Sequence, residues 1–459
     1  MLRFEIVVLS ISIVIVCFAS CNSKKEAETP VCEPITLRIW HTESDPTAQA
    51  VFTKIEKDFE AEESKKHGCA VDVQTLSISW GAMAAKLSAA LESRSEPDLA
   101  HLEPFMTYSL FKMNILEPID DVVKAIEAEN GKISVAVRDL QKYGTHHYGI
   151  AYAVGSTFYA YRKDWASAAG WKEKPIEDWE DILALATALK TGAKASGVSD
   201  SSAVVIPGAS PFFIDQLTVE LLASAGGSLF GGTKNAPQLE SKEFISVLEF
   251  LKKLSAFFPK SWHRVDYQSQ FELLGRDEVG MVLVTYARAL KALEKSKAGA
   301  DDNIFAVFEP PPAVKGKNLK GYSTIDAEDW VIFKRRPKDN RHLAKKFLKK
   351  FYENKYYMPF CKAVPLHLGP IFENKLEDTL SPAFVQRWAS WGRQAQLLLS
   401  KKRTRPIFIA SPNDEKIPYL MRMEQGKVIS DAVMSVILDD VSPESAAKTA
   451  QQRALKYAD

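Results

Sequence analysis

Short patterns of chemically reactive residues give little support for catalysis. His101-x-Glu103 and His146-His147 are the patterns that suggest a metal site, but neither has a third ligand at a usable spacing. Gly226-Gly227 and Gly231-Gly232 are not followed by the Lys-Ser/Thr pair of a phosphate-binding loop, and no Gly-x-Ser-x-Gly nucleophile motif is present. We therefore predict no catalytic residue, no metal and no cofactor. A glycan-processing enzyme with two opposed carboxylates remains the alternative.

Aromatic and polar side chains cluster instead at the ends of short apolar runs. Six of them lie at or just after three strand-like segments: Trp40, His41, Glu43, Trp80, Glu103 and Phe105. Aromatic faces can stack on the apolar face of a small molecule, and carboxylates accept hydrogen bonds from it. Core packing is the alternative role for each ring. Glu43 can alternatively be a charge at a helix N-terminus.

The elements that must position these residues alternate between strand and helix. The predicted order is strand 35–40, helix 48–63, strand 70–76, helix 83–91 and strand 97–102. Val51, Ile55 and Phe59 recur at a spacing of four, which is typical of a helix that faces a core. This alternation predicts βαβ units and a parallel sheet, in which ligands bind beyond the carboxyl ends of the strands. The loops at 41–46, 77–82 and 103–106 are therefore the expected binding rim.

Later segments extend the α/β pattern. A helix is predicted after Trp179, another over Leu217–Ala225 that stops at a Gly-Gly pair, and a terminal helix opens at Ser442-Pro443. The 459 residues are enough for two domains. A net charge of +1, with both signs interspersed, provides no basic surface for nucleic acid.

The N-terminus has the pattern of an export signal. Residues 6–20 are almost wholly apolar, and their length fits the core of a signal peptide better than a membrane span of roughly 30 Å. The segment ends Phe18-Ala19-Ser20-Cys21, which resembles a bacterial lipobox and implies cleavage after residue 20 and acylation of Cys21. Plain secretion is the alternative. Residues 21–34 are polar and are expected to form a flexible tether.

The remaining cysteines fit a protein outside the cytoplasm. Cys32 and Cys69 each precede a strand-like run, and parallel pairing of these strands would bring both thiols to one sheet edge. We therefore predict a Cys32–Cys69 disulfide. Cys361 is predicted to be a buried free thiol.

Several motifs in order resemble the family 1 extracellular solute-binding proteins, the group similar to maltose-binding protein. They are Pro97-Asp98-Leu99, Tyr148 to Tyr152, Tyr159 to Trp165, Trp179-Glu180-Asp181, Ala225-Gly226-Gly227, Phe271 to Met281 and Ser442 to Ala446. The resemblance covers residues 35–459. Ala151 replaces a usual proline and Arg162 a common asparagine, and Asp326–Asp329 occupies a region usually rich in small residues. These departures bear on the ligand more than on the fold.

The resemblance implies an α/β fold with two lobes of the type II periplasmic-binding-protein kind, joined by a hinge and closing on a cleft. The expected first lobe comprises residues 35–154 plus 328–366, and the second comprises 155–327 plus 367–459. Crossing segments are expected near 154–157, 326–329 and 365–369.

The resemblance also implies further site residues and a function. By position it assigns ligand contacts in the second lobe and the late segments to Phe212, Phe213, Tyr286, Arg288, Asp329 and Tyr419. We expect a monomeric lipoprotein, anchored to the cell membrane, that passes a mono- or oligosaccharide to the permease of an ABC importer. One alternative is another polar solute, such as a polyol or a sugar phosphate; Arg288, Arg264 or His41 would then contact the anionic group of a phosphate. Another alternative is a sensor that does not transport its ligand.

Overall fold

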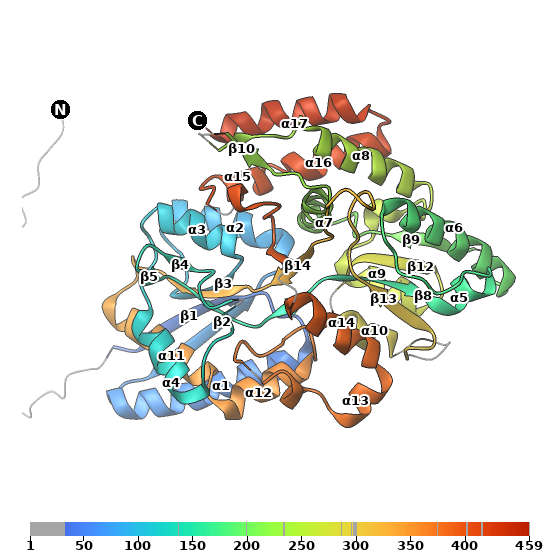
Figure 1. Ribbon diagram of the computed structural model, residues 1–459. Helices are drawn as coiled ribbons and strands as arrows, with labels where there is room; N and C mark the ends of the chain where they lie inside the picture. Colours follow the sequence, from blue (N-terminus) through green and yellow to red (C-terminus); the bar gives the residue numbers. More distant parts are fainter. Residues whose placement is uncertain are drawn as a thin grey trace, which may run out of the picture.

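Two separate β-sheets, each covered by helices, organise the chain in the computed structural model (Figure 1). The structure describes residues 33–458 except 136, 199, 233, 234, 286, 295, 297–300, 374, 401, 402 and 415. The predicted signal peptide, Cys21, Cys32 and Tyr286 therefore lie outside the described residues. Within the described part of the chain, no helix combines the length and the apolar character needed to cross a membrane.

The first sheet contains the strands that the sequence pattern predicts near the N-terminus. In spatial order it consists of β2 (Val71–Ser77), β1 (Ile35–His41), β3 (Leu99–Leu102), β15 (Asp329–Ile332) and β6 (Ile150–Ala151). β1 pairs in parallel with β2 and β3, whereas β15 is antiparallel to its neighbours β3 and β6. The carboxyl ends of β1, β2 and β3 consequently lie at one edge of this sheet.

Helices cover both faces of the first sheet, and together they form the first lobe. They are α1 (Pro46–His67), α2 (Trp80–Glu92), α3 (Pro104–Lys112), α4 (Asp120–Asn130), α11 (Lys338–Phe351) and α12 (Asn354–Ala363). Asp45 starts α1 by accepting hydrogen bonds from the backbone N–H groups of Thr47 and Ala48, and Gly68 ends it with a left-handed φ of 68°. Ile55 and Phe59 are buried, as their spacing predicts.

The second sheet organises the second lobe. Its order is β13 (Phe305–Phe308), β8 (Phe158–Arg162), β12 (Val279–Thr285) and β9 (Ser202–Val205). The surrounding helices are α5 (Lys163–Ala168), α6 (Trp179–Ala195), α7 (Pro211–Ser224), α8 (Lys242–Ser255), α9 (Tyr267–Gly275), α10 (Ala289–Leu293), α13 (Pro382–Arg387), α14 (Ala389–Ser400), α16 (Val428–Leu438) and α17 (Pro443–Ala458). β12 and β9 are parallel, so their carboxyl ends also share an edge.

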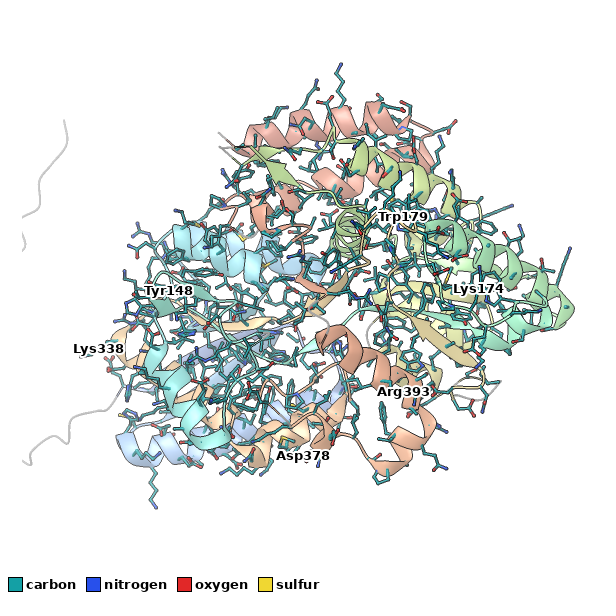
Figure 2. All side chains as sticks on the ribbon, viewed as in Figure 1. Tyr148, Lys174, Trp179, Lys338, Asp378 and Arg393 are labelled. Carbon is teal, nitrogen blue, oxygen red and sulfur yellow. The ribbon has the colours of Figure 1, made fainter. Side chains whose placement is uncertain are left out.

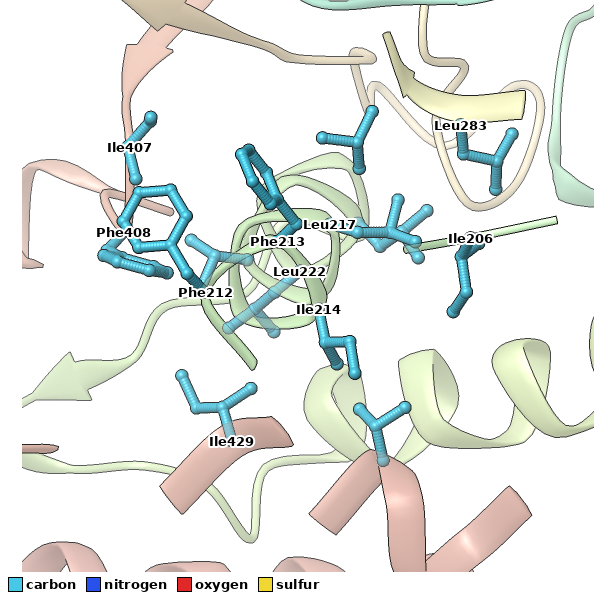
Figure 3. Packing of buried hydrophobic residues seen from close by; sticks show 14 of the residues in the cluster. Ile206, Phe212, Phe213, Ile214, Leu217, Leu222, Leu283, Ile407, Phe408 and Ile429 are labelled. Atoms are coloured by element: carbon cyan, nitrogen blue, oxygen red, sulfur yellow. The ribbon is translucent and has the colours of Figure 1, made fainter. Parts of the chain in front are cut away.

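Helix α7 is buried on every side. It begins at Pro211, directly after Ser210, and therefore starts six residues earlier than the apolar run from Leu217 suggests. All residues from Phe212 to Ser224 are buried. Figure 3 shows this helix end-on, with Phe212 beside Ile407 and Phe408.

Side chains fill the space between the layers of both lobes (Figure 2). Trp179 stacks on Phe250 with ring centroids 4.6 Å apart, and Tyr148 packs against Phe111 at 4.8 Å. Trp179 therefore holds α6 to α8 and has a structural role.

Three short strands form a small sheet where the chain passes between the lobes. They are β16 (Thr404–Pro406), β14 (Ser323–Asp326) and β7 (Gly155–Ser156). The chain leaves the first sheet after β6, passes through β7 and enters the second at β8; it returns through β14 to β15. A third connection lies beside these, because Val154 pairs with Gly369.

The apolar core of the first lobe extends past the expected boundary at residue 366. Leu368, Ile371 and Phe372 are buried in the cluster that also holds Leu37 and Ile39. The remaining elements are β4 (Lys142–Tyr143), β5 (His146–His147), β10 (Phe230–Gly231), β11 (Ala236–Pro237), α15 (Leu420–Gln425) and 3₁₀ turns at Trp262–Arg264, Glu377–Thr379 and Pro412–Asp414.

The cysteines that the structure describes have different states. Cys361 is a buried free thiol, as predicted. Cys69 is disulfide-bonded, and β1 and β2 are parallel neighbours. Cys32, the predicted partner of Cys69, lies outside the described residues, so this pairing stays a prediction.

Candidate functional site

A cavity of about 500 Å³ lies between the two lobes. Its walls come from the loops after β1, β2 and β3 in the first lobe and from residues after β9 and β12 in the second. Its charged and aromatic lining residues are Glu43, Trp80, His101, Glu103, Tyr152, Phe212, Phe213, Asp266, Tyr267, Arg288, Glu328 and His367. The strand ends of both sheets thus bring polar and aromatic groups to one place.

A buried ion pair joins the two lobes across this cavity. Arg288 Nη1 lies 3.1 Å from Glu43 Oε1, and Arg288 Nη2 lies 3.3 Å from Glu43 Oε2. Glu43 follows β1 in the first lobe, whereas Arg288 follows β12 in the second. Their side chains are 1% and 13% exposed. This two-point geometry fixes the distance and the orientation of the two lobes at the cavity wall.

The surroundings of Glu43 keep its carboxylate charged. Burial alone raises the pKa of Glu43, but the charge and hydrogen bonds of Arg288 and the backbone N–H of Asp45 outweigh it and lower the pKa below its usual value. The backbone N–H groups of Ser44 and Asp45 donate to Oε1 at 2.8 and 2.6 Å. Burial likewise disfavours the charge on Arg288, yet Glu43 raises the Arg288 pKa overall. Both groups are ionised at neutral pH.

His367, in the third connection between the lobes, is the second partner of Arg288. Its Nε2 lies 3.1 Å from Arg288 Nε and 2.9 Å from Arg288 Nη2. Because a guanidinium only donates, this nitrogen must carry a lone pair. Burial, followed by the positive charge of Arg288, lowers the pKa of His367 well below its ordinary value. His367 is therefore a neutral acceptor at neutral pH.

Strained backbone lies near both members of this contact in the chain. Val284 and Leu366 adopt left-handed φ values of 51° and 65°. Non-glycine residues pay about 1–2 kcal/mol for this conformation. Val284 lies near the end of β12, where the pairing with β8 shifts register before Arg288. Leu366 immediately precedes His367, so both strained residues lead into the contact.

His101 is a neutral, buried histidine in the first-lobe wall. Its Nδ1 lies 2.8 Å from Thr42 Oγ1, and its Nε2 lies 3.2 Å from Glu328 Oε2. Burial lowers the pKa of His101 to about 3. The ring packs on Tyr152 with centroids 3.9 Å apart. Thr42 and the tyrosine hold the imidazole in place beside Glu328.

Two stacks of aromatic rings form the apolar part of the wall. Trp80, at the start of α2 in the first lobe, stacks on Phe212, at the start of α7 in the second, with centroids 5.7 Å apart and planes 12° apart. Phe213 stacks on Tyr267 at 4.2 Å and 12°. The first stack is a second direct contact between the lobes.

Six of the residues predicted from sequence line this cavity. They are Glu43, Trp80, Glu103, Phe212, Phe213 and Arg288. The three predicted loops of the first lobe all reach it, through residues 42–44, 79–81 and 103.

Two predicted residues on β1 lie away from the cavity because side chains alternate along a strand. His41 shares the buried face of Leu37 and Ile39, and it stacks on Phe52 of α1 with centroids 4.8 Å apart. Trp40 points to the opposite face, where the ammonium of Lys86 lies 5.4 Å from its ring centroid. Both residues pack the sheet against helices and do not line the cavity.

Two other predicted aromatic residues pack elsewhere in the core. Phe105 contacts Phe408 edge to face at 4.8 Å, next to the cavity but not in its lining. Tyr419 packs edge-on against Phe230 at 5.6 Å. Tyr286 lies outside the described residues.

Asp329 also points away from the cavity. It is the first residue of β15, and Thr107 Oγ1 donates to its Oδ1 at 2.7 Å. Burial raises its pKa well above the ordinary value. Its neighbour Glu328 lines the cavity instead, because successive side chains face opposite sides of a strand.

The sequence interpretation missed Tyr152, Asp266, Tyr267 and His367. Asp266 caps α9 by accepting from Ser269 N at 2.8 Å, so a helix-start pattern marks this position. Tyr152 and His367 lie in connections whose place depends on how the lobes meet, and no local pattern identifies them. Among the described residues, no group of three or more His, Cys, Asp or Glu could hold a metal ion.

The buried neutral histidine predicts a pH dependence of stability. The pKa of His101 is about 3 in the folded protein and 6.5 in the unfolded chain. The stabilisation that the neutral imidazole gives to the folded state is therefore complete above pH 6.5 and is lost as the pH falls toward 3. In urea denaturation between pH 6 and 4, the slope of unfolding free energy against pH should decrease by about 1.4 kcal/mol per pH unit in His101→Gln. The exposed His342→Gln is the control. Equal slopes in wild type and His101→Gln would contradict this assignment.

Comparison with solved structures places the fold among binding proteins of ABC transporters. A solute-binding protein from Agrobacterium radiobacter K84 in complex with ribitol has a TM-score of 0.70 at 19% identity, covering 92% of this chain and 98% of that one. A sugar transporter from Arthrobacter chlorophenolicus A6 with bound laminaribiose has a TM-score of 0.72 at 15% identity, covering 92% and 98%. Maltose-bound MalE3 of T. maritima has a TM-score of 0.71 at 15% identity, covering 92% and 99%. The expected two-lobed α/β fold is confirmed.

Comparison with curated protein sequences gives no match. The family model of the bacterial extracellular solute-binding proteins, in contrast, matches residues 54–389, which is more than half of the chain. The fold, the cavity between the lobes and this match agree with the resemblance seen in the sequence motifs. The chain belongs to the bacterial extracellular solute-binding protein family.

Proposed function

We propose that this chain captures a carbohydrate or a polyol outside the cytoplasm and delivers it, chemically unchanged, to the permease of an ABC importer. The observation that carries this proposal is a cavity whose walls combine aromatic faces and polar groups from both lobes. Structures with the same fold hold ribitol, laminaribiose and maltose.

The composition of the wall suits such a solute. The C–H faces of a sugar ring pack on aromatic rings such as Trp80 and Tyr267. Hydroxyl groups donate to carboxylates and exchange hydrogen bonds with hydroxyls, which Glu103, Thr42 and Ser210 provide here. A volume of about 500 Å³ lies within the range of small-molecule sites, and it suits a monosaccharide, a polyol or a short oligosaccharide.

The position of the cavity provides a mechanism for capture. A solute that contacts both walls binds the closed arrangement more tightly than the open one and therefore shifts the population toward closure. The small sheet of β7, β14 and β16 would serve as the hinge. A closed, solute-loaded monomer is then the form that the permease recognises.

Trp80→Ala is expected to weaken solute binding about tenfold, because an aromatic contact is worth roughly 0.5–1.5 kcal/mol beyond its area and the lost apolar burial adds to this. Titration calorimetry would measure this with a solute identified by thermal-shift screening of sugars and polyols that includes ribitol, maltose and laminaribiose. Trp40→Ala removes a tryptophan from the same lobe outside the cavity and should leave affinity unchanged.

Unchanged affinity in Trp80→Ala, or an equal loss in Trp40→Ala, would contradict the packing of the solute on the ring of Trp80. The melting temperatures of both variants serve to separate lost binding from lost folding.

We also propose that a lipid on Cys21 anchors the protein to the outer face of a membrane. The apolar segment 6–20 and the small residues before Cys21 support this. In a bacterial host, Cys21→Ser should move the protein from the membrane fraction to the soluble fraction, since acylation needs the thiol. Continued membrane association of Cys21→Ser would argue against the anchor.

A further inference from the structure

Three glutamates converge on the first-lobe wall of the cavity. Glu43 follows β1, Glu103 follows β3 and Glu328 precedes β15. β1, β3 and β15 are neighbours in the sheet. β15 and β3 are antiparallel with Asp329 opposite Leu102, so the next pair of residues, Glu328 and Glu103, also lie opposite each other. All three residues are at least 92% buried and line the cavity. The wall therefore brings three carboxyl groups together at one end of the sheet.

The described lining offers little positive charge to a solute. Arg288 is the one lysine or arginine in it, and this guanidinium already binds Glu43 through two nitrogens. His101 and His367 are neutral at pH 7 because burial lowers the pKa of each. An anionic solute would consequently enter a cavity with four carboxylates and one guanidinium in its wall.

The carboxylates have different structural roles. Asp266 caps α9, since both Ser269 N and Ser269 Oγ donate to its Oδ1 at 2.8 Å, so its position is explained by the helix. Glu43 is held by Arg288, and Glu328 Oε2 lies 3.2 Å from His101 Nε2. Glu103 immediately precedes Pro104 at the start of α3, where the helix dipole favours a negative charge.

The aromatic stacks add a second feature that favours a cation. The faces of aromatic rings carry negative electrostatic potential and attract ammonium groups within about 6 Å. Trp80, Phe212, Phe213 and Tyr267 line the same cavity as Glu103 and Glu328. Rings combined with carboxylates are the chemistry by which proteins bind protonated amines.

We propose that the solute carries a protonated amine, so that the natural ligand class is an amino sugar or amino polyol whose ammonium binds between Glu103 and Glu328. This inference rests on the proposed function, and it names the substrate class of the same cavity. The amine supplies three donors to the two carboxylates, and the ring faces cover the rest of the solute. Sugar phosphates and sugar acids are correspondingly disfavoured.

Two matched series of solutes test the charge preference in titration calorimetry at pH 7. The first is glucosamine, glucose and glucuronate; the second is 1-amino-1-deoxysorbitol, sorbitol and gluconate. We expect the amine of at least one series to bind at least tenfold more tightly than its neutral parent, and the acid to bind most weakly. The wild-type protein alone provides this comparison, so it does not depend on the folding of a variant.

Variants then assign the preference to the glutamates. Glu103→Gln and Glu328→Gln should each reduce the ratio of amine to parent affinity about tenfold, and Glu180→Gln, at a 75% exposed position on α6, should leave it unchanged. The proposal is overturned if, in both series, the parent or the acid binds as tightly as the amine, or if neither amine binds. If the amine preference is absent but neutral sugars or polyols from the thermal-shift screen bind, the proposed function stands and only the amine proposal fails. If no carbohydrate or polyol binds, the proposed function fails as well.

Discussion

The ion pair of Glu43 and Arg288 is the contact on which the arrangement of the site depends. It is buried, it makes two hydrogen bonds and it joins a loop of one lobe to a loop of the other. Removing both charges from water is costly, so such a pair contributes little net stability even though breaking it inside the closed cavity would cost several kcal/mol. In an open protein both groups regain water. If the lobes close as proposed, the pair would set the geometry of the closed form while adding little net free energy to it, and a solute could then shift the balance.

Several features of the chain serve this contact. The left-handed residues Val284 and Leu366 lie close in sequence to Arg288 and His367, and a strained backbone of this kind persists only where surrounding structure holds it. Helix α7, buried along its whole length, fixes Phe212 against Trp80. The ion pair and the ring stack both line the cavity and both join the two lobes, so a polar and an apolar contact hold the lobes together at this site.

The fold and about half of the predicted site follow from the sequence for identifiable reasons. A four-residue spacing predicted α1, and alternation of strands and helices predicted the parallel strands β1, β2 and β3, after which the loops reach the cavity. It did not predict the antiparallel strands β15 and β6, which complete the first sheet. This rule located Glu43, Trp80 and Glu103. It did not resolve which face a residue near a strand end takes, and so it included His41, which packs on Phe52. His367 could not be predicted, because it lies in a connection between the lobes that contacts Arg288 only in the folded protein, and the two residues are far apart in the sequence.

The central claim is that the two lobes close on a solute, and the distance between them tests it most directly. Spin labels on cysteines introduced at the exposed residues Lys124 of α4 and Lys190 of α6 report this distance by double electron–electron resonance. We expect a broad or longer distance distribution without solute, which narrows and shortens when the tightest-binding sugar, polyol or amino derivative is added. A distribution that is identical with and without saturating solute would contradict it.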